Sequence, residues 1–300
     1  MRNSVERYAV TLQVLSPVHI GDGREIAART ITAQSAARTQ PSQPQKFTEW
    51  VLYQDKAIVL NMDRVLDLSE AARNRLMFDM EQHGASADNP CVAYILDAAD
   101  VADINRYSIK TFMKDPYGQP YVPGSSLKGA LRTCLRQALL RTIPPATEDP
   151  FHGLSVADSE SLHKEDLIVS QKIDRSHSKG DSNMPLVREC LRPDTLVRTT
   201  INIDRRLFRW DLEKAVGDFF QDYMAHYVTG NHWEEYFAYY SNFNVLFLGG
   251  GTGFESKVIA ENTQDRNKQI PWGRHVLKLT FNQGYNVPMG MCDFRMERLS

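Results

Sequence analysis

The sequence YVPGSSLKGALR, which occupies residues 121–132, joins a turn to the start of a helix. Pro123-Gly124 is a turn signal that ends an extended segment. The hydroxyl of Ser125 or Ser126 can then cap a helix, because it accepts a hydrogen bond from a free amide of the first helical turn. Apolar residues follow at helical spacing, which predicts an amphipathic helix behind the turn.

A basic stripe lies beside the apolar one, with Lys128, Arg132 and Arg136 recurring every four residues. Free amides, the positive end of the helix dipole and nearby cations favour an anion such as phosphate. The alternative is a capped amphipathic helix with a solvated basic face. Residues 106–141 include seven basic residues and only one acidic residue, although the formal net charge of the whole chain is −2. The positive charge is therefore local, which favours a surface for a polyanion.

The composition is that of a folded protein, since the 300 residues include 42% hydrophobic and 24% charged residues. No apolar run is long enough to span a bilayer and the N-terminus lacks an apolar signal core, so we expect a cytoplasmic protein without a membrane partner. The four cysteines are far apart in sequence, which argues against a zinc site or a redox pair. Cys134 and Cys292 fall in apolar phase, as buried thiols do. We expect no metal and no cofactor.

Hydrophobic periodicity predicts strands and helices along a single domain that spans residues 1–300. Residues 24–45 lack an apolar period, so we expect a mobile loop there. Residues 174–185 are polar and lie between strand-like runs, which predicts a projecting loop or hairpin tip. The regular segments are strands at 8–14, 106–113, 154–158, 167–173, 195–203, 245–248, 276–281 and 291–296, a hairpin at 50–60, a helix at 68–83 opened by Ser69 and closed by Gly84, and a core helix capped by Asp211.

Two further glycine-rich segments lie on either side of the helix in sequence. LSPVHIGDG at residues 15–23 follows the first strand, and its His19 is either a catalytic base or, as we favour, a structural histidine. GGGTGFESK at residues 249–257 suits close backbone approach to phosphates, or it is a structural turn. Its glycine spacing fits neither a Walker A loop nor a dinucleotide fingerprint.

Taken in order, these three segments resemble the glycine motifs of the RAMP superfamily of CRISPR effector subunits. The middle motif, at residues 122–132, is the most specific. The order of the motifs, the lengths between them and the late glycine-rich lysine motif look most like the type III-A Csm subunit that caps the backbone at the crRNA 3′ end. The resemblance covers nearly the whole chain.

The resemblance implies an α+β, ferredoxin-like (RRM-related) RAMP fold with large insertions, including a thumb-like hairpin at residues 174–192. It implies a crRNA-binding structural subunit of an antiviral ribonucleoprotein, which supports crRNA 3′ maturation. The expected partners are crRNA, target RNA near the guide 3′ end, other Csm-type backbone subunits and host nucleases. The residues expected at the RNA are His19, Gly21, Gly124, Ser125, Ser126, Lys128, Arg132, Arg136, Gly250, Gly251, Thr252, Gly253 and Lys257.

One departure from the family pattern concerns catalysis. Backbone subunits that cut target RNA carry an Asp in the loop after the first glycine motif, whereas residues 24–49 hold only Glu25 and Glu49 as acids, and Asp22 lies too close to the first strand. Metal-assisted RNA cleavage needs a carboxylate or another ligand near the scissile phosphate, so we expect a subunit that is not an enzyme. Two alternatives stay open: a crRNA-processing endoribonuclease with His19 as acid/base, and a phosphate- or nucleotide-binding domain that uses residues 249–253.

Overall fold

The computed structural model describes residues 5–26, 49–101, 104, 107–139, 151–176, 180–225, 239–253, 256–257, 276–282 and 285–299. The helices are α2 (Met62–Leu66), α3 (Glu70–His83), α4 (Gly124–Leu139) and α5 (Leu212–Tyr223), with a 3-10 turn η2 (Lys164–Asp166). The strands are β1 (Val5–Val14), β2 (Gly21–Ile26), β3 (Trp50–Tyr53), β4 (Lys56–Leu60), β5 (Val92–Asp97), β6 (Ile109–Phe112), β7 (Leu154–Val156), β8 (Leu167–Ser176), β9 (Gly180–Leu191), β10 (Leu196–Asp204), β11 (Val245–Phe247), β12 (Val276–Asn282), β13 (Tyr285–Pro288) and β14 (Met291–Arg298).

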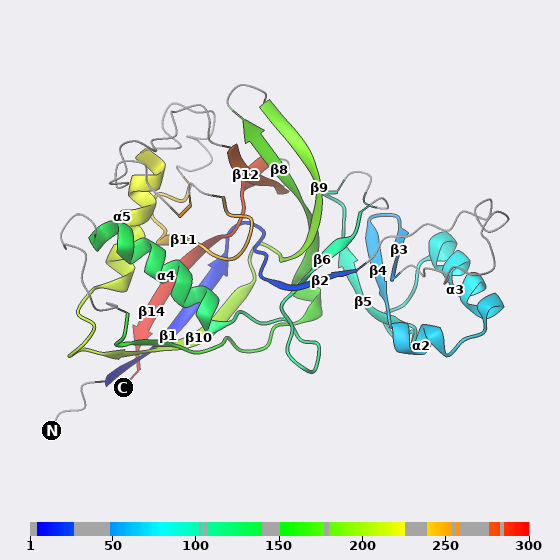
Figure 1. The fold of residues 1–300 in the computed structure, drawn as a ribbon, viewed down its shortest axis with the longest axis horizontal. Coiled ribbons are helices and arrows are strands. Elements are labelled where there is room, and N and C mark those ends of the chain that lie inside the picture. The colour runs from blue at the N-terminus through cyan, green and yellow to red at the C-terminus, as the bar shows by residue number, and fades with distance from the viewer. Residues whose placement is uncertain are drawn as a thin grey trace.

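The first sheet is antiparallel, with the strand order β11-β14-β1-β10-β7. Strand β1 lies at its centre because it pairs with β10 on one side and β14 on the other, and its alternate side chains Val10, Leu12 and Val14 are buried in the core. Helices α4 and α5 lie side by side across one face of this sheet (Figure 1). Burial of both helices against the sheet forms the main hydrophobic core.

The second sheet runs in the order β2-β6-β9-β8-β5-β4-β3, and β12 pairs with β8 and with β13. Strands β8 and β9 form its long antiparallel hairpin, which extends well beyond the first sheet in Figure 1. Strands β3, β4 and β5 carry helices α2 and α3 at the opposite end of the molecule from α5 (Figure 1). A second group of buried residues, including Ile58, Val65 and Met80, holds this end together.

Most of the predicted elements are confirmed, including the hairpin at residues 50–60 and the helix opened by Ser69 and closed by Gly84. Asp211 caps α5, whose apolar face is buried as predicted. Cys134 and Cys292 are buried, and the four cysteines are free thiols. Among the described residues, no helix combines the length and the apolar character needed to cross a membrane.

One loop boundary needs correction, and one open alternative is decided by the structure. The mobile loop was predicted to begin at residue 24, but residues 24–26 belong to β2, which pairs with β6; residues 27–45 lie outside the described residues. Of the two alternatives for the polar segment at residues 174–185, a projecting loop or a hairpin tip, the structure confirms the hairpin. Residues 174–176 end β8 and residues 180–185 begin β9, so the pairing continues to Ser176 and Gly180.

Candidate nucleic-acid interface

The first and third glycine motifs meet at one point on the molecule. The amide of Gly250 donates to the carbonyl oxygen of His19 across 2.7 Å. Gly249 has a φ of +87°, and a Cβ there would lie 2.2 Å from the same carbonyl oxygen, so a side chain is excluded. Gly250 is exposed. The contact therefore joins the exits of β1 and β11 and presents bare glycine backbone at the surface.

The imidazole of His19 lies beneath this junction with only 6% of the residue exposed. Its Nδ1 donates to the carbonyl oxygen of Glu189 at 2.7 Å, which leaves Nε2 as the unprotonated nitrogen of the neutral ring. Burial lowers the pKa of His19 from 6.5 to about 4, against the opposing effect of the Glu189 carbonyl. Gly21 approaches closely, because a Cβ there would lie 2.9 Å from Nε2. These contacts support the structural interpretation of His19 over the acid/base alternative.

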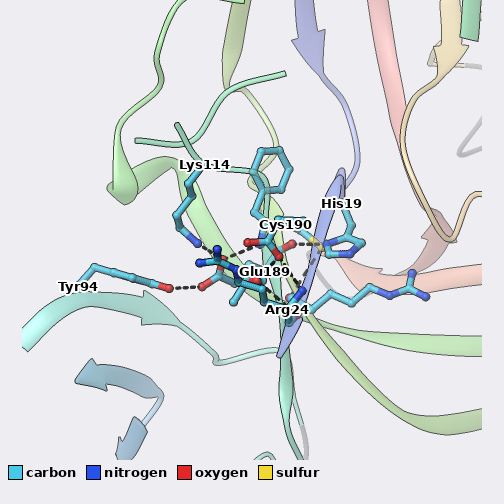
Figure 2. Close-up of polar contacts among 10 residues, drawn as sticks. His19, Arg24, Tyr94, Lys114, Glu189 and Cys190 are labelled. Carbon is cyan, nitrogen blue, oxygen red and sulfur yellow. Dashed lines mark hydrogen bonds and ion pairs between the residues drawn. The ribbon is translucent and has the colours of Figure 1, made fainter. Parts of the chain in front are cut away.

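Glu189 connects three elements beside this histidine. Its carboxylate is fully buried and accepts from the Tyr94 hydroxyl at 2.6 Å, from the Phe112 amide at 2.7 Å and from the Lys114 ammonium group. Figure 2 shows Tyr94 and Lys114 reaching the carboxylate while His19 contacts the backbone of the same residue. Burial, reinforced by this carboxylate, raises the pKa of Tyr94, so its hydroxyl stays a donor. Glu189 thus holds β5, β6 and β9 together behind the glycine junction.

The start of α4 differs from the prediction. The helix begins at Gly124, whose amide donates to the Asp158 carboxylate at 2.7 Å, so neither Ser125 nor Ser126 provides the cap. A Cβ on Gly124 would lie 2.3 Å from the carbonyl oxygen of Val156, which explains the glycine. An internal carboxylate therefore accepts from the first amide of this helix, and the predicted phosphate contact at the helix start stays a prediction.

The basic stripe on α4 is narrower than the sequence predicts. Lys128 is turned inward, and its Nζ donates to the carbonyl oxygen of Leu154 at 2.6 Å. Arg132 and Arg136 are exposed, and the Arg132 guanidinium lies 5.1 Å from the centre of the Phe151 ring. Ser125 and Gly129 are exposed on the same helix at intervals that place them on one face with Arg132.

Other charges counted in this region are neutralised. Lys110 pairs with Glu25 at 3.4 Å, and Lys114 pairs with the buried Glu189. Residues 106 and 141 lie outside the described residues. Among the described residues of this region, the exposed basic side chains on α4 are Arg132 and Arg136, and further candidates lie in the third motif.

The residues of the third glycine motif differ in their exposure to solvent. Thr252 is buried, Gly251 and Gly253 are half-buried, and Lys257 is exposed and has a partner. The guanidinium of Arg188 lies directly against Gly251. Sequence reasoning missed Arg188, because it lies in the segment assigned to a projecting hairpin and its contact with Gly251 depends on long-range pairing. Within the described residues, no three potential metal ligands are grouped to hold an ion.

The model of the RAMP superfamily matches residues 11–254, and the chain belongs to this superfamily. A relative from Enterococcus italicus, named CRISPR system Cms protein Csm5, is 29% identical over 292 residues, which cover 83% of this chain and 79% of the relative.

Two solved structures show the same fold. A chain of a Csm–crRNA–target RNA ternary complex from a type III-A CRISPR-Cas system has a TM-score of 0.69 and 18% identity, covering 97% of this chain and 100% of that chain. The crystal structure of T. onnurineus Csm5 has a TM-score of 0.61 and 20% identity, covering 94% of this chain and 99% of that chain.

Proposed function

We propose that this chain is a crRNA-binding structural subunit of a type III-A Csm effector complex. In this role it caps the backbone at the crRNA 3′ end, supports 3′ maturation and contacts target RNA near the guide 3′ end. Membership of the RAMP superfamily supports the proposal, as does the relative that carries the name Csm5. The similarity in fold to a chain of a Csm–crRNA–target RNA complex agrees with it.

The observation that carries the proposal is the junction of the first and third glycine motifs. The hydrogen bond from Gly250 to His19 fixes exposed glycine backbone at the surface, where no side chain keeps a ligand away. Backbone of this kind suits phosphate contacts, which hold RNA in register and read little of its sequence. The exposed Arg132 and Arg136 on α4 add two cations for the same polyanion.

We assign the first sheet to a ferredoxin-like core. Its strand order β14-β1-β10-β7, with α4 before β7 and α5 after β10 in the chain, supports this assignment. The β8–β9 hairpin, which extends beyond this sheet, is the candidate for the thumb-like element at residues 174–192. Other Csm-type backbone subunits and host nucleases are the proposed protein partners.

The proposed subunit does not cut RNA. Asp22, the carboxylate nearest the first glycine motif, accepts from the Thr111 hydroxyl and from the Arg24 amide, the latter at 2.9 Å. Both contacts give this carboxylate a structural role. The burial of His19 and its pKa of about 4 argue against the endoribonuclease alternative, because an efficient acid/base group titrates nearer to neutral pH.

The test is removal of this subunit from its native host, followed by purification of the effector through another subunit and sequencing of the bound guide RNA. We expect changed guide 3′ ends and a shorter complex. Guides with unchanged ends in a complex of unchanged size would contradict the capping role. The purified chain should leave complementary RNA intact with Mg²⁺, and cleavage that Asp22→Asn abolishes would instead identify a nuclease.

A further inference from the structure

Arg188 on β9 is a buried cation without a carboxylate partner among the described residues. The residue is 8% exposed, its Nη1 contacts the Met289 sulfur at 3.6 Å, and its Nε donates to no acceptor. Buried charges in proteins are normally paired, since an unpaired one is costly to remove from water. Burial lowers the pKa of Arg188, but a guanidinium stays charged in proteins at neutral pH.

Asp174 attracts Arg188 electrostatically, but no direct ion pair joins the two side chains among the described residues. Ser170 lies opposite Arg188 in the β8–β9 pair, and Lys172 and Asp174 follow along β8. Asp174 forms ion pairs with both Lys172 and Lys278, each with a nitrogen–oxygen distance of 3.0 Å. One carboxylate is thus shared between two lysines, and Arg188 adds a third cation. We call these four residues the β8–β9 basic face: Lys172, Asp174, Arg188 and Lys278.

The third glycine motif covers the inner end of this face. A Cβ at Gly251 would lie 1.9 Å from Arg188 Nη1, so the bare backbone rests on the guanidinium. Gly249, Gly251 and Gly253 have φ values of +87°, +87° and +88°, whereas Gly250 and Thr252 between them do not have positive φ. Alternation between right- and left-handed backbone is typical of the nests in which successive amides bind an anion. Among the described residues, the amides of Gly251 and Gly253 reach no acceptor.

We propose that Arg188 and the amides of Gly251 and Gly253 form a seat for one phosphate group of an RNA backbone. A phosphate supplies the negative charge that Arg188 lacks and accepts from a planar guanidinium in a fork geometry. The site lies on β9 and the third glycine motif and not on α4, and Lys172 on β8 and Lys278 on the paired strand β12 add positive charge beside it. That the polymer is guide RNA rests on the proposed function, whereas the seat itself can be tested with inorganic phosphate.

The first experiment measures thermal unfolding of the full chain with inorganic phosphate against chloride at equal ionic strength. Phosphate should raise the Tm of the wild type, because it binds the folded state only. Arg188→Met should lose this response. Without phosphate, its Tm should equal or exceed that of the wild type, since an unpaired buried charge has been removed. A phosphate response that Arg188→Met retains, or a large loss of Tm in phosphate-free buffer, would overturn the proposal.

The second experiment measures RNA affinity as a function of salt, with single-stranded RNA of guide sequence. Arg188→Met should weaken binding roughly tenfold and reduce the salt slope by roughly 0.7, as expected when the protein neutralises one phosphate fewer. Arg188→Lys, which keeps the charge without the fork, should weaken binding less. Arg206→Gln is the control, because Arg206 is exposed and pairs with Asp204 at 2.6 Å.

The two failures are distinguishable. If the wild-type protein shows the phosphate response but binds no RNA, the proposed function is contradicted and the phosphate site is supported. If the wild type and Arg188→Met bind RNA equally well and with the same salt slope, the phosphate site is contradicted and the proposed function is not.

Discussion

The backbone amide of Gly250 donates to the carbonyl oxygen of His19, and this bond of 2.7 Å ties the exit of β11 to the exit of β1. A second contact supports it, because the Gly290 amide donates to the Pro17 carbonyl oxygen at 3.0 Å. The turns at Gly250 and Gly290 therefore both donate hydrogen bonds to the loop at residues 15–20. At Gly249 and Gly290 a Cβ would meet a backbone carbonyl oxygen, that of His19 at 2.2 Å and that of Leu248 at 2.5 Å, so these two glycines serve the fold.

Gly249→Ala should destabilise the chain far more than Gly23→Ala. Both glycines have nearly the same φ, +87° and +86°, so both substitutions carry the left-handed penalty of about 1–2 kcal/mol. Only at Gly249 does the new methyl group meet backbone, the His19 carbonyl oxygen at 2.2 Å, while nothing lies within 4 Å of a Cβ at Gly23. The clash should add about 1–3 kcal/mol in urea unfolding. Equal losses for both variants would show that the junction yields easily.

The stability of the chain should fall on acidification because of His19. Its pKa is lowered from 6.5 to about 4 in the folded state, so the unfolded chain binds this proton more readily. The contribution of neutral His19 to stability is complete above the unfolded pKa of 6.5 and is lost as the pH falls towards 4. The loss of folding free energy near pH 5, relative to neutral pH, should be about 2 kcal/mol.

His19→Asn is the matched variant, because its amide can still donate to the Glu189 carbonyl oxygen but does not titrate. Unfolding free energies near pH 7 and near pH 5 should differ less for this variant than for the wild type. An equal pH dependence in both proteins would assign the acid sensitivity to other groups.

Local signals in the sequence were sufficient for much of the fold. Ser69 and Gly84 mark the ends of α3, and Asp211 marks the start of α5, because capping depends on residues next to the helix. Strand β2 was missed, since its glycines and charges give no alternation and its pairing partner β6 lies far along the chain. Strand formation there depends on a partner that local composition does not specify.

The candidate site was harder to predict for the same reason. Asp158, which caps α4, lies 34 residues from Gly124, so the nearby serines were the obvious but wrong candidates. Lys128 has the spacing of an exposed stripe, yet the carbonyl oxygen of Leu154 holds it inward. Arg188 and Glu189 are adjacent on β9, so their side chains point to opposite faces of the sheet. Arg188 contacts Gly251 and Glu189 contacts Lys114, and both partners lie far away in the sequence.

Substitutions on α4 should separate structural from RNA-binding cations. Lys128→Met should lower stability by about 1–3 kcal/mol, because the carbonyl oxygen of Leu154 loses its donor, and it should leave the salt slope of RNA binding unchanged. Arg132→Gln with Arg136→Gln should reduce that slope by roughly 0.7 for each phosphate that is no longer neutralised, with little effect on stability. The reverse pattern would place the RNA contact at Lys128.

Gly129→Ala should stabilise the unliganded chain. The glycine lies inside α4, it is exposed, and nothing lies within 4 Å of a Cβ built there. Alanine in an exposed helix interior is favoured over glycine by about 1 kcal/mol. If RNA backbone passes close to this face, the same substitution should weaken binding although Tm rises. A rise in Tm with unchanged RNA affinity would show that this part of the helix faces away from RNA.

Glu189→Gln should be the most damaging single change among these predictions. The carboxylate is fully buried and accepts from Tyr94, Phe112 and Lys114, and Lys114 is itself largely buried. The amide leaves the Lys114 charge without compensation, and breaking a buried pair in this way costs about 3–5 kcal/mol. Lys114→Met in the same chain should recover part of that loss, because it removes the uncompensated charge.

Asp97→Asn is the control for this prediction, since the pair of Asp97 with Lys56 is exposed and contributes about 0–1 kcal/mol. Urea unfolding of the wild type, the two single variants Glu189→Gln and Lys114→Met, and the double variant gives the coupling free energy between Glu189 and Lys114. A coupling near zero would mean that Tyr94 and the Phe112 amide, and not the ion pair, hold Glu189 behind His19. In that case the junction with Gly250 would depend on hydrogen bonds between neutral donors and one carboxylate.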